Sequence, residues 1–277
     1  MKSHLITIVT GLIVCTGFPY PTTAHNLIHH SLSHDKSKPR ESLAIDLAQD
    51  VESNPESAED YYNRGKLYYE SGQTQQALTD LNRAIELNPN YAKAYVGRGV
   101  LYYESGQTQQ ALVDYDRAIE LDPQLAEAYA NRGVLYKQSG QAEKALTDYD
   151  QAIELNPQLA EAYANRGNLY GESGQAEKAL FDFNRAIELN PNYAEAYYNR
   201  GVLYGKLEQA EKALFDYDRA IKLDSQLAKA YANRGLLYAQ SGNVSQGKKD
   251  LEQAADLFLQ QGDDRSYQKV SQMLQQL

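Results

Sequence analysis

The sequence predicts an all-α fold built from repeated helical hairpins, and three observations support this prediction. The stretch LYYESGQTQQAL occurs at 67–78 and again at 101–112, so its second copy begins 34 residues after the first. Within each such period, apolar or small residues recur twice at the spacing of one helix face. A glycine separates the two helical stretches in most copies, and a proline usually follows the second. Hairpins that cannot bury their apolar faces alone stack against their neighbours, which predicts a solenoid.

Alignment on Gly65 shows that the period runs six times. The predicted repeats are 58–91, 92–125, 126–159, 160–193, 194–227 and 228–261. The stripes of the first repeat are Tyr61, Gly65 and Tyr68 on one helix and Ala77, Leu81 and Ala84 on the other. Two antiparallel helices approach closely only where side chains are short, so Gly65 is expected to face the alanines of its partner helix.

Glycine and proline mark the ends of the predicted helices. Gly72 is expected to end the first helix in the left-handed conformation, which glycine adopts most easily. The same glycine recurs as Gly106, Gly140 and Gly174. Glu208 takes its place in repeat five, and Gly247 in repeat six stands where the other repeats have alanine. The LNP or LDP stretch ends the second helix, because proline disfavours helical geometry in the preceding residue.

These positions resemble the tetratricopeptide repeat (TPR) in both residue type and period. The matching residues of the first repeat are Tyr61, Gly65, Tyr68, Gly72, Ala77, Ala84 and Pro89. The resemblance covers 58–261. It implies a TPR solenoid, which is a right-handed superhelix of helix-turn-helix repeats with a concave groove. It also implies a general function, the binding of protein segments and the organisation of complexes.

Both ends of such an array need a cap, because a terminal repeat exposes an apolar face. A C-terminal capping helix is expected over 262–277. Its apolar face consists of Tyr267, Val270, Met273, Leu274 and Leu277. At the other end, 43–57 resembles half a repeat and is interpreted as a degenerate capping helix, although Asp50 stands where that register has alanine.

The N-terminal segment has the features of a secretory signal peptide, expected over 1–24. Lys2 supplies the positive start, Leu5 to Phe18 the short apolar run, and Ala24 a small residue before the cleavage point. The mature protein is therefore expected outside the cytoplasm, either secreted or periplasmic. The alternative is a membrane anchor formed by the uncleaved segment. Residues 25–42 are interpreted as a polar linker rich in histidine and serine.

Cysteine and histidine are confined to this N-terminal part. Cys15 is the only cysteine, and Val14 before it is not the small residue that lipid attachment would require, so no lipid anchor is expected. The histidines that follow the apolar run are His25, His29, His30 and His34. Spacings of four residues among them would suit a shared metal ion on a helix. A hydrophilic linker with little to bury is the preferred interpretation.

Charge and composition exclude several classes of function. The formal net charge of −10 argues against nucleic-acid binding, because phosphate recognition needs a basic face. The repeats contain neither histidine nor cysteine. Nothing in them matches a nucleophile beside a base, a Gly-rich phosphate loop or a metal cluster. We therefore expect no catalytic residues, no metal ion in the repeats, no cofactor and no small-molecule substrate.

Arginine and aspartate recur in every repeat. The arginine row is Arg64, Arg98, Arg132, Arg166, Arg200 and Arg234, and the aspartate row is Asp80, Asp114, Asp148, Asp182, Asp216 and Asp250. Arg64 and Asp80 lie eight residues on either side of Gly72, hence opposite each other in the hairpin. Bidentate pairing suits these two side chains, so a structural role is preferred to an anion-binding row of arginines.

Asparagine recurs immediately before these arginines and marks the candidate binding site. The row is Asn63, Asn131, Asn165, Asn199 and Asn233, with Gly97 at the same position in repeat two. At about 100° per residue this position points away from the partner helix. The resemblance places it in the groove, where some peptide-binding arrays use an asparagine ladder. The alternative is an ordinary solvated surface.

An amide side chain offers both a donor and an acceptor, which matches a peptide backbone without reading its sequence. Aromatic residues that would line the same groove are Tyr62, Tyr69, Tyr103 and Tyr198. The leading functional hypothesis is an exported, non-enzymatic adaptor that binds an extended segment of another protein. A scaffold that is tethered to the membrane or assembles with itself is the alternative, and an enzyme is the least favoured class.

Overall fold

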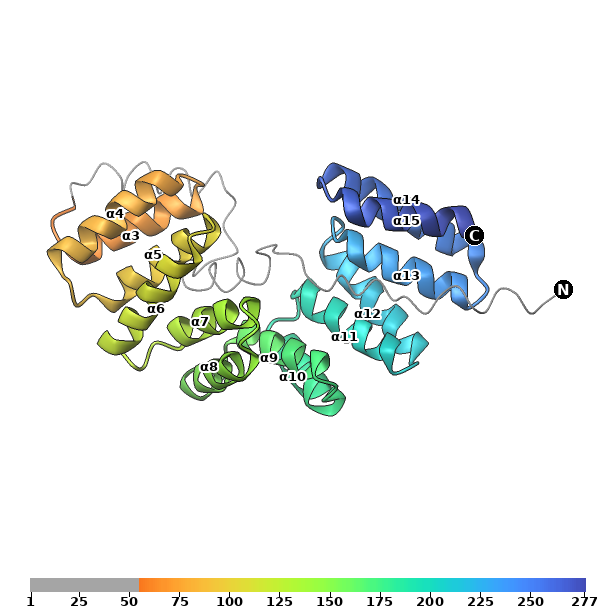
Figure 1. The fold of residues 1–277 in the computed structure, drawn as a ribbon, viewed down its shortest axis with the longest axis horizontal. Coiled ribbons are helices and arrows are strands. Elements are labelled where there is room, and N and C mark those ends of the chain that lie inside the picture. The colour runs from red at the N-terminus through yellow and green to blue at the C-terminus, as the bar shows by residue number, and fades with distance from the viewer. Residues whose placement is uncertain (1–54) are drawn as a thin grey trace. The chain divides into compact units, whose positions relative to one another are not determined.

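In the computed structural model, which describes residues 55–277, the chain is helical and contains no strand within that range. The first helices of the hairpins are α3 (Ala58–Glu70), α5 (Ala92–Glu104), α7 (Ala126–Gln138), α9 (Ala160–Glu172), α11 (Ala194–Lys206) and α13 (Ala228–Gln240). The second helices are α4 (Thr74–Leu87), α6 (Thr108–Leu121), α8 (Ala142–Leu155), α10 (Ala176–Leu189), α12 (Ala210–Leu223) and α14 (Val244–Gln260). The last helix is α15 (Asp264–Gln276) (Figure 1). The predicted all-α architecture of helix-turn-helix repeats is confirmed.

Several expectations concern residues outside this range. The signal peptide (1–24), the linker (25–42) with its histidines, and most of the predicted N-terminal cap (43–57) lie outside the described residues. Among the helices of the described part, none is both long enough and apolar enough to cross a membrane.

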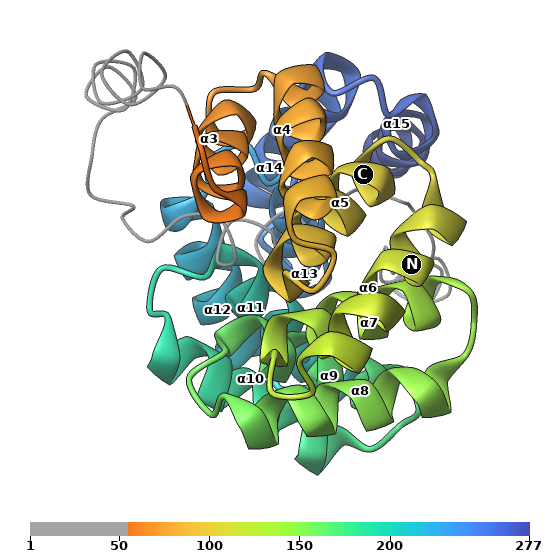
Figure 2. The same ribbon diagram turned by 90° about the vertical axis from the view of Figure 1, so that its left-hand side faces the viewer.

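The described residues divide into two compact units, of which the first ends at Arg166 and the second begins at Gly167, within α9. In the first unit, α3, α4 and α5 lie side by side (Figure 2). In the second unit, α13, α14 and α15 share an apolar cluster in which Val270 of α15 is fully buried with Leu251 and Phe258 of α14.

The turn inside each hairpin ends the first helix as predicted. Gly72 has a φ of +78°, and the N–H of Gln73 donates to the Tyr68 carbonyl at 2.7 Å. This pattern satisfies carbonyl groups that the helix end leaves open. Gly106, Gly140 and Gly174 have φ values of 77°, 74° and 76°. Repeat five makes the same turn with Glu208 at a φ of 57°, the one positive value on a non-glycine residue in the described part of the chain.

Small residues allow the two helices of a hairpin to approach closely. A Cβ atom on Gly65 would lie 3.3 Å from the Ala77 carbonyl oxygen, as expected for a glycine that faces alanine. In repeat two the tighter neighbour is an aromatic ring instead, since a Cβ on Gly99 would lie 2.7 Å from the Tyr115 ring. Repeat six has its closest approach at Gly247, where a Cβ would lie 2.7 Å from a backbone oxygen. This explains why glycine replaces alanine there.

Candidate peptide-binding face

The arginine row joins the two helices of a hairpin. Arg64 Nε and Nη2 donate to the two carboxylate oxygens of Asp80 at 2.6 and 2.8 Å. The same bidentate contact is made by Arg98–Asp114, Arg132–Asp148, Arg200–Asp216 and Arg234–Asp250. The aspartate side chains of these pairs are at most 5% exposed. The predicted structural pairing is therefore confirmed for these five pairs.

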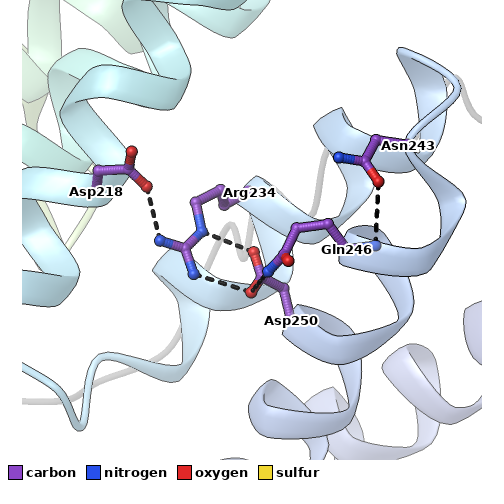
Figure 3. Close-up of polar contacts among 5 residues, drawn as sticks. All are labelled: Asp218, Arg234, Asn243, Gln246 and Asp250. Carbon is purple, nitrogen blue, oxygen red and sulfur yellow. Dashed lines mark hydrogen bonds and ion pairs between the residues drawn. The ribbon is translucent and has the colours of Figure 1, made fainter.

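Most of these arginines also contact the preceding repeat, which the sequence analysis did not predict. The additional acceptors are Asn82 for Arg98, Asp116 for Arg132, Asp150 for Arg166, Asn184 for Arg200 and Asp218 for Arg234, at 2.6 to 2.9 Å. Figure 3 shows Arg234 between Asp218 of α12 and Asp250 of α14. The signal in the sequence was an asparagine or aspartate two residues after the members of the aspartate row.

Tyrosine rings flank the same guanidinium groups. In repeat two, the Arg98 guanidinium carbon lies 5.5 Å from the Tyr95 ring centre and 5.7 Å from that of Tyr102. Such contacts are attractive because the ring face is electron-rich. In repeat three, the hydrogen bond from Arg132 to Asp148 raises the pKa of the arginine, which therefore stays charged. Carboxylates and rings already occupy these cations, which argues against the alternative of an anion-binding row.

The asparagine face is defined here, separately for each unit, as the side of the first helices that carries this row. Its residues are Asn63, Gly97, Asn131 and Asn165 in the first unit and Asn199 and Asn233 in the second. Asn131, Asn165 and Asn233 are only 4%, 2% and 3% exposed. Asn199 is half-buried and Asn63 is exposed. The alternative of an ordinary solvated surface is wrong for the three buried asparagines. At Gly97 a Cβ atom would meet Leu81 and Tyr62, and Asn233 contacts Tyr198, so the position lies against the preceding hairpin. Helical spacing within one hairpin does not report such contacts.

The buried amides are only partly hydrogen-bonded. Nδ2 of Asn131 and Nδ2 of Asn165 have no partner and are shielded from water. Asn233 Nδ2 does have a partner, because it donates to the Tyr198 hydroxyl at 3.2 Å, while its Oδ1 has none. A buried donor without a partner costs about 1–3 kcal/mol, and native proteins contain few of them. Asn131 and Asn165 are therefore the strongest candidates for contact with a ligand.

The predicted aromatic residues connect neighbouring repeats. The Tyr69 hydroxyl donates to Glu104 at 2.6 Å, and the Tyr103 hydroxyl accepts from Gln138. Tyr62 of α3 packs edge-on against Tyr91, the residue directly before α5, with ring centres 5.4 Å apart. Burial raises the pKa of Tyr69, and the hydrogen bond to Glu104 adds to the rise. These side chains hold repeats together, and a contact with a ligand stays a prediction.

Charges of both signs lie along this part of the molecule. Lys66 of α3 is half-buried, and burial lowers its pKa, while the carboxylates of Glu70 and of Glu127 on α7 act in the opposite direction. Glu161 of α9 is 1% exposed. The charged residues named here are three carboxylates and one ammonium group, so they do not form a basic site for an anionic ligand.

Family models match nearly the whole array. A model described as TPR repeat matches residues 65–106, 99–140, 135–174 and 167–208, which together span 144 of the 277 residues. Models described as Tetratricopeptide repeat match 194–227 and 228–260. No curated protein matches the chain in sequence.

Solved structures share the architecture. A chain of the APC/C hetero-tetramer Cut9–Hcn1 aligns with a TM-score of 0.76 at 17% identity, over 95% of this chain and 50% of that chain. PilF of Pseudomonas aeruginosa aligns with a TM-score of 0.63 at 20% identity, over 82% of this chain and 99% of that chain. These two alignments show the fold. YrrB, described as a TPR protein with an unusual peptide-binding site, is 28% identical over 70% of this chain and 97% of that chain, with a TM-score of 0.49.

Proposed function

This chain belongs to the tetratricopeptide repeat family, and from that premise we propose that it is an adaptor that binds an extended segment of a partner protein on its asparagine face. The repeats form a scaffold suited to protein–protein interaction. TPR proteins typically bind other proteins or peptides and are typically not enzymes. Our proposal adds to this general role that the partner binds as an extended segment and that it binds on the asparagine face.

The proposal rests on two amide donors without an acceptor, Nδ2 of Asn131 and Nδ2 of Asn165. Asn131 and Asn165 occupy the same position in consecutive repeats, both are buried, and Nδ2 of each lacks an acceptor. A buried donor without an acceptor raises the free energy of the free protein. A ligand that supplies the acceptor removes this penalty, which favours binding. A segment of extended chain carries an acceptor on every residue, so it can serve two such donors in succession.

Binding of defined peptides tests the proposal. The full chain is used to select from random 12-residue peptides displayed on phage, and enriched peptides are synthesised and titrated by calorimetry. Changing both Asn131 and Asn165 to Ala is expected to weaken binding roughly fivefold to a hundredfold, because each lost hydrogen bond contributes about 0.5–1.5 kcal/mol. Asn63→Ala is the matched control, since Asn63 belongs to the same row but is exposed. Equal affinities for the double variant and the wild type would contradict the proposal.

We also propose that the protein is exported, on the basis of Lys2, the short apolar run and Ala24. N-terminal sequencing of protein recovered from the producing cell is expected to begin at His25. A mature chain that begins at Met1 would contradict cleavage and favour the membrane-anchored alternative. This test is independent of peptide binding.

A further inference from the structure

We propose that the second helices α10 and α12 (Figure 1) form a docking surface for a second copy of this chain, so that the protein forms a two-fold symmetric dimer. This surface, named the phenylalanine patch, lies entirely within the second unit. Its residues are Phe181, Glu177 and Arg185 of α10 and Phe215, Glu211 and Arg219 of α12. The inference does not rest on the proposed peptide binding, which concerns the first helices.

The two phenylalanine side chains are largely exposed to solvent. Phe181 is 65% exposed and Phe215 is 61% exposed. Phenylalanine is a poorer helix former than lysine, so helix propensity does not explain two aromatic rings there. Both rings occupy one position of consecutive repeats, where the other repeats carry Thr79, Val113, Thr147 and Lys249. The rings are thus a feature of repeats four and five and not of the repeat as such.

One arginine places the two helices side by side. Nη1 of Arg200, on α11, donates to Asn184 Oδ1 of α10 at 2.6 Å. Nε and Nη2 of the same arginine donate to the Asp216 carboxylate of α12 at 2.8 and 2.7 Å. Asn184 lies one turn after Phe181, and Asp216 directly follows Phe215. The two rings therefore belong to one surface, and exposed apolar surface of this kind marks interaction sites.

A hollow borders one of the two rings. It has a volume of about 280 Å³ and is lined by Arg200, Tyr204, Glu211, Lys212, Phe215 and Asp216. An aromatic ring that enters this hollow would contact both Phe215 and Tyr204, and contacts between rings are favourable. Two phenylalanines brought face to face by a second copy would supply such a ring.

The charges around the rings identify the occupant as a second copy. Each ring has a glutamate four residues before it and an arginine four residues after it, on the same helix face. Consider a two-fold axis that lies in the surface and crosses both helices at the rings. Rotation about this axis brings each ring opposite its own counterpart and each glutamate opposite an arginine of the other copy. The phenylalanine patch is therefore complementary to itself.

The residues three positions from each ring follow the same rule. On α12, Lys212 stands three residues before the ring and Asp218 three residues after it. On α10 the corresponding residues are Lys178 and Asn184. The same rotation brings lysine opposite aspartate or asparagine. The other two-fold arrangement, in which α10 of one copy runs parallel to α12 of the other, would bring glutamate against glutamate, and like charges repel. The charge pattern therefore selects the antiparallel arrangement.

The other repeats lack this combination of ring and charges. Val113 of repeat two is also exposed, but Gln109 takes the place of the glutamate before it. Thr147 of repeat three has Glu143 before it but Gln151 in place of the arginine after it. Repeats one and six have threonine and lysine at the ring position. One surface of this kind forms a closed pair of copies, whereas a surface on every repeat would permit many registers.

The present partners of these charges leave room for the new contacts. Arg185 forms an exposed pair with Glu188 at 3.1 Å, and such pairs contribute little, so the arginine can change partners at low cost. Asp218, which pairs with Arg234, is half exposed and has a second carboxylate oxygen. Two rings are fewer than a standard interface of about 800 Å² per partner contains, so the expected dissociation constant is roughly 10–100 µM.

Sedimentation velocity of the full chain, recovered from the producing cell, tests the inference at about 5 to 500 µM. The wild type is expected to change from monomer to dimer over this range. Phe181→Thr and Phe215→Thr together, which introduce the residue of repeats one and three, should weaken dimerisation at least about tenfold. Val113→Thr is the matched control, since it changes the same position of repeat two, and it should dimerise like the wild type. A monomeric wild type, or unchanged dimerisation of the double variant, overturns the inference.

Charge reversal tests the antiparallel arrangement. Glu177→Arg with Glu211→Arg makes both sides of each ring positive, and Arg185→Glu with Arg219→Glu makes both sides negative. Each double variant alone should dimerise at least about tenfold more weakly than the wild type, and an equimolar mixture of the two should recover dimerisation. Failure of the mixture to recover, or wild-type dimerisation of either variant alone, overturns the inference. The phenylalanine variants keep it falsifiable if a charge variant does not fold.

A membrane is the competing occupant of an exposed aromatic surface. Vesicles of phosphatidylcholine and phosphatidylglycerol that bind the wild type, but not the double phenylalanine variant, would assign the patch to a membrane if the wild type stays monomeric in solution. That result overturns the inference. The Asn131→Ala, Asn165→Ala variant should dimerise like the wild type. Loss of peptide binding therefore leaves the dimer standing, and a monomeric wild type leaves the proposed function standing.

Discussion

Each arginine of the arginine row directly follows a residue of the asparagine face, yet the hydrogen bonding of the two positions differs. In repeat three, Arg132 makes three hydrogen bonds, two to Asp148 and one to Asp116, at 2.7 to 2.9 Å. Asn131 precedes it by one residue, about 100° around the same helix, and its Nδ2 has no partner. Both positions recur with the period of the array, so recurrence alone does not distinguish them.

The difference separates a structural role from a binding role. An ion pair that is fully hydrogen-bonded has its interactions in the folded state and gains nothing from a ligand. A buried amide without a partner is a cost of about 1–3 kcal/mol that a ligand or an ordered water molecule can offset. The bonding state of a repeated polar residue is thus more informative about function than its repetition.

The largest effect on stability is expected when an arginine of the arginine row loses its aspartate partner. Asp148→Ala leaves Arg132 partly buried, at 19% exposure, without its bidentate partner. We expect the free energy of unfolding to fall by about 2–4 kcal/mol, somewhat less than for a fully buried pair. Urea melts followed by circular dichroism measure the change.

A double-variant cycle decides whether that effect belongs to the pair. Arg132→Ala alone should be similarly destabilising, and the double variant should lose less than the sum of the two. Strict additivity would show that the two side chains do not interact in solution, and the contrast with the asparagine face would then disappear.

Substitution of Asn131 or Asn165 should have the opposite effect on the free energy of unfolding. Asn131→Ala and Asn165→Ala each remove a buried donor without a partner, and alanine is the better helix former, so we expect each to raise the free energy of unfolding by about 1 kcal/mol. Asn233→Ala is the control, because it removes a formed bond to Tyr198 and should lower stability by about 0.5–1.5 kcal/mol. The same urea melts apply. A loss of stability of equal size in all three variants would mean that the amides of Asn131 and Asn165 are bonded in the free protein.

The smallest effect is expected for the contact between repeats. Asp116→Ala removes the second acceptor of Arg132, and this carboxylate is 46% exposed. Exposed ion pairs contribute little, so the expected loss is about 0.5 kcal/mol. Thermal melts of Asp116→Ala beside Asp148→Ala measure the difference, and comparable losses would show that the arginine is held by both repeats equally.

Much of the fold could be predicted because the turn chemistry is local. The left-handed glycines and the residue before each proline fix helix ends within a few positions, and the pairing of Arg64 with Asp80 follows from their equal distance to Gly72. The contact of Arg98 with Asn82 could not be found that way, because it joins different hairpins and depends on how they stack. Burial of Asn131 depends on stacking for the same reason.

Repeat five shows that the preference of a single residue does not decide whether the hairpin turn forms. Glutamate at 208 argues against the left-handed cap, yet the turn is made, with the Gln209 N–H donating to the Tyr204 carbonyl at 2.9 Å. Packing of α11 on α12 overrides the local preference of one residue.

The left-handed backbone of Glu208 affects how the protein opens locally. A non-glycine residue in the left-handed region costs about 1 kcal/mol or more, and a linear array transmits such a cost only to its nearest neighbours. The α11–α12 turn should therefore separate from its hairpin more often than the turns that contain glycine. In amide hydrogen exchange, the N–H of Gln209 should lose protection several-fold faster than its counterpart Gln73, whose bond to Tyr68 is made over Gly72. A protease that cleaves after exposed glutamate should cut first at this turn among the hairpin turns, because Glu208 is exposed and its backbone is in the left-handed region.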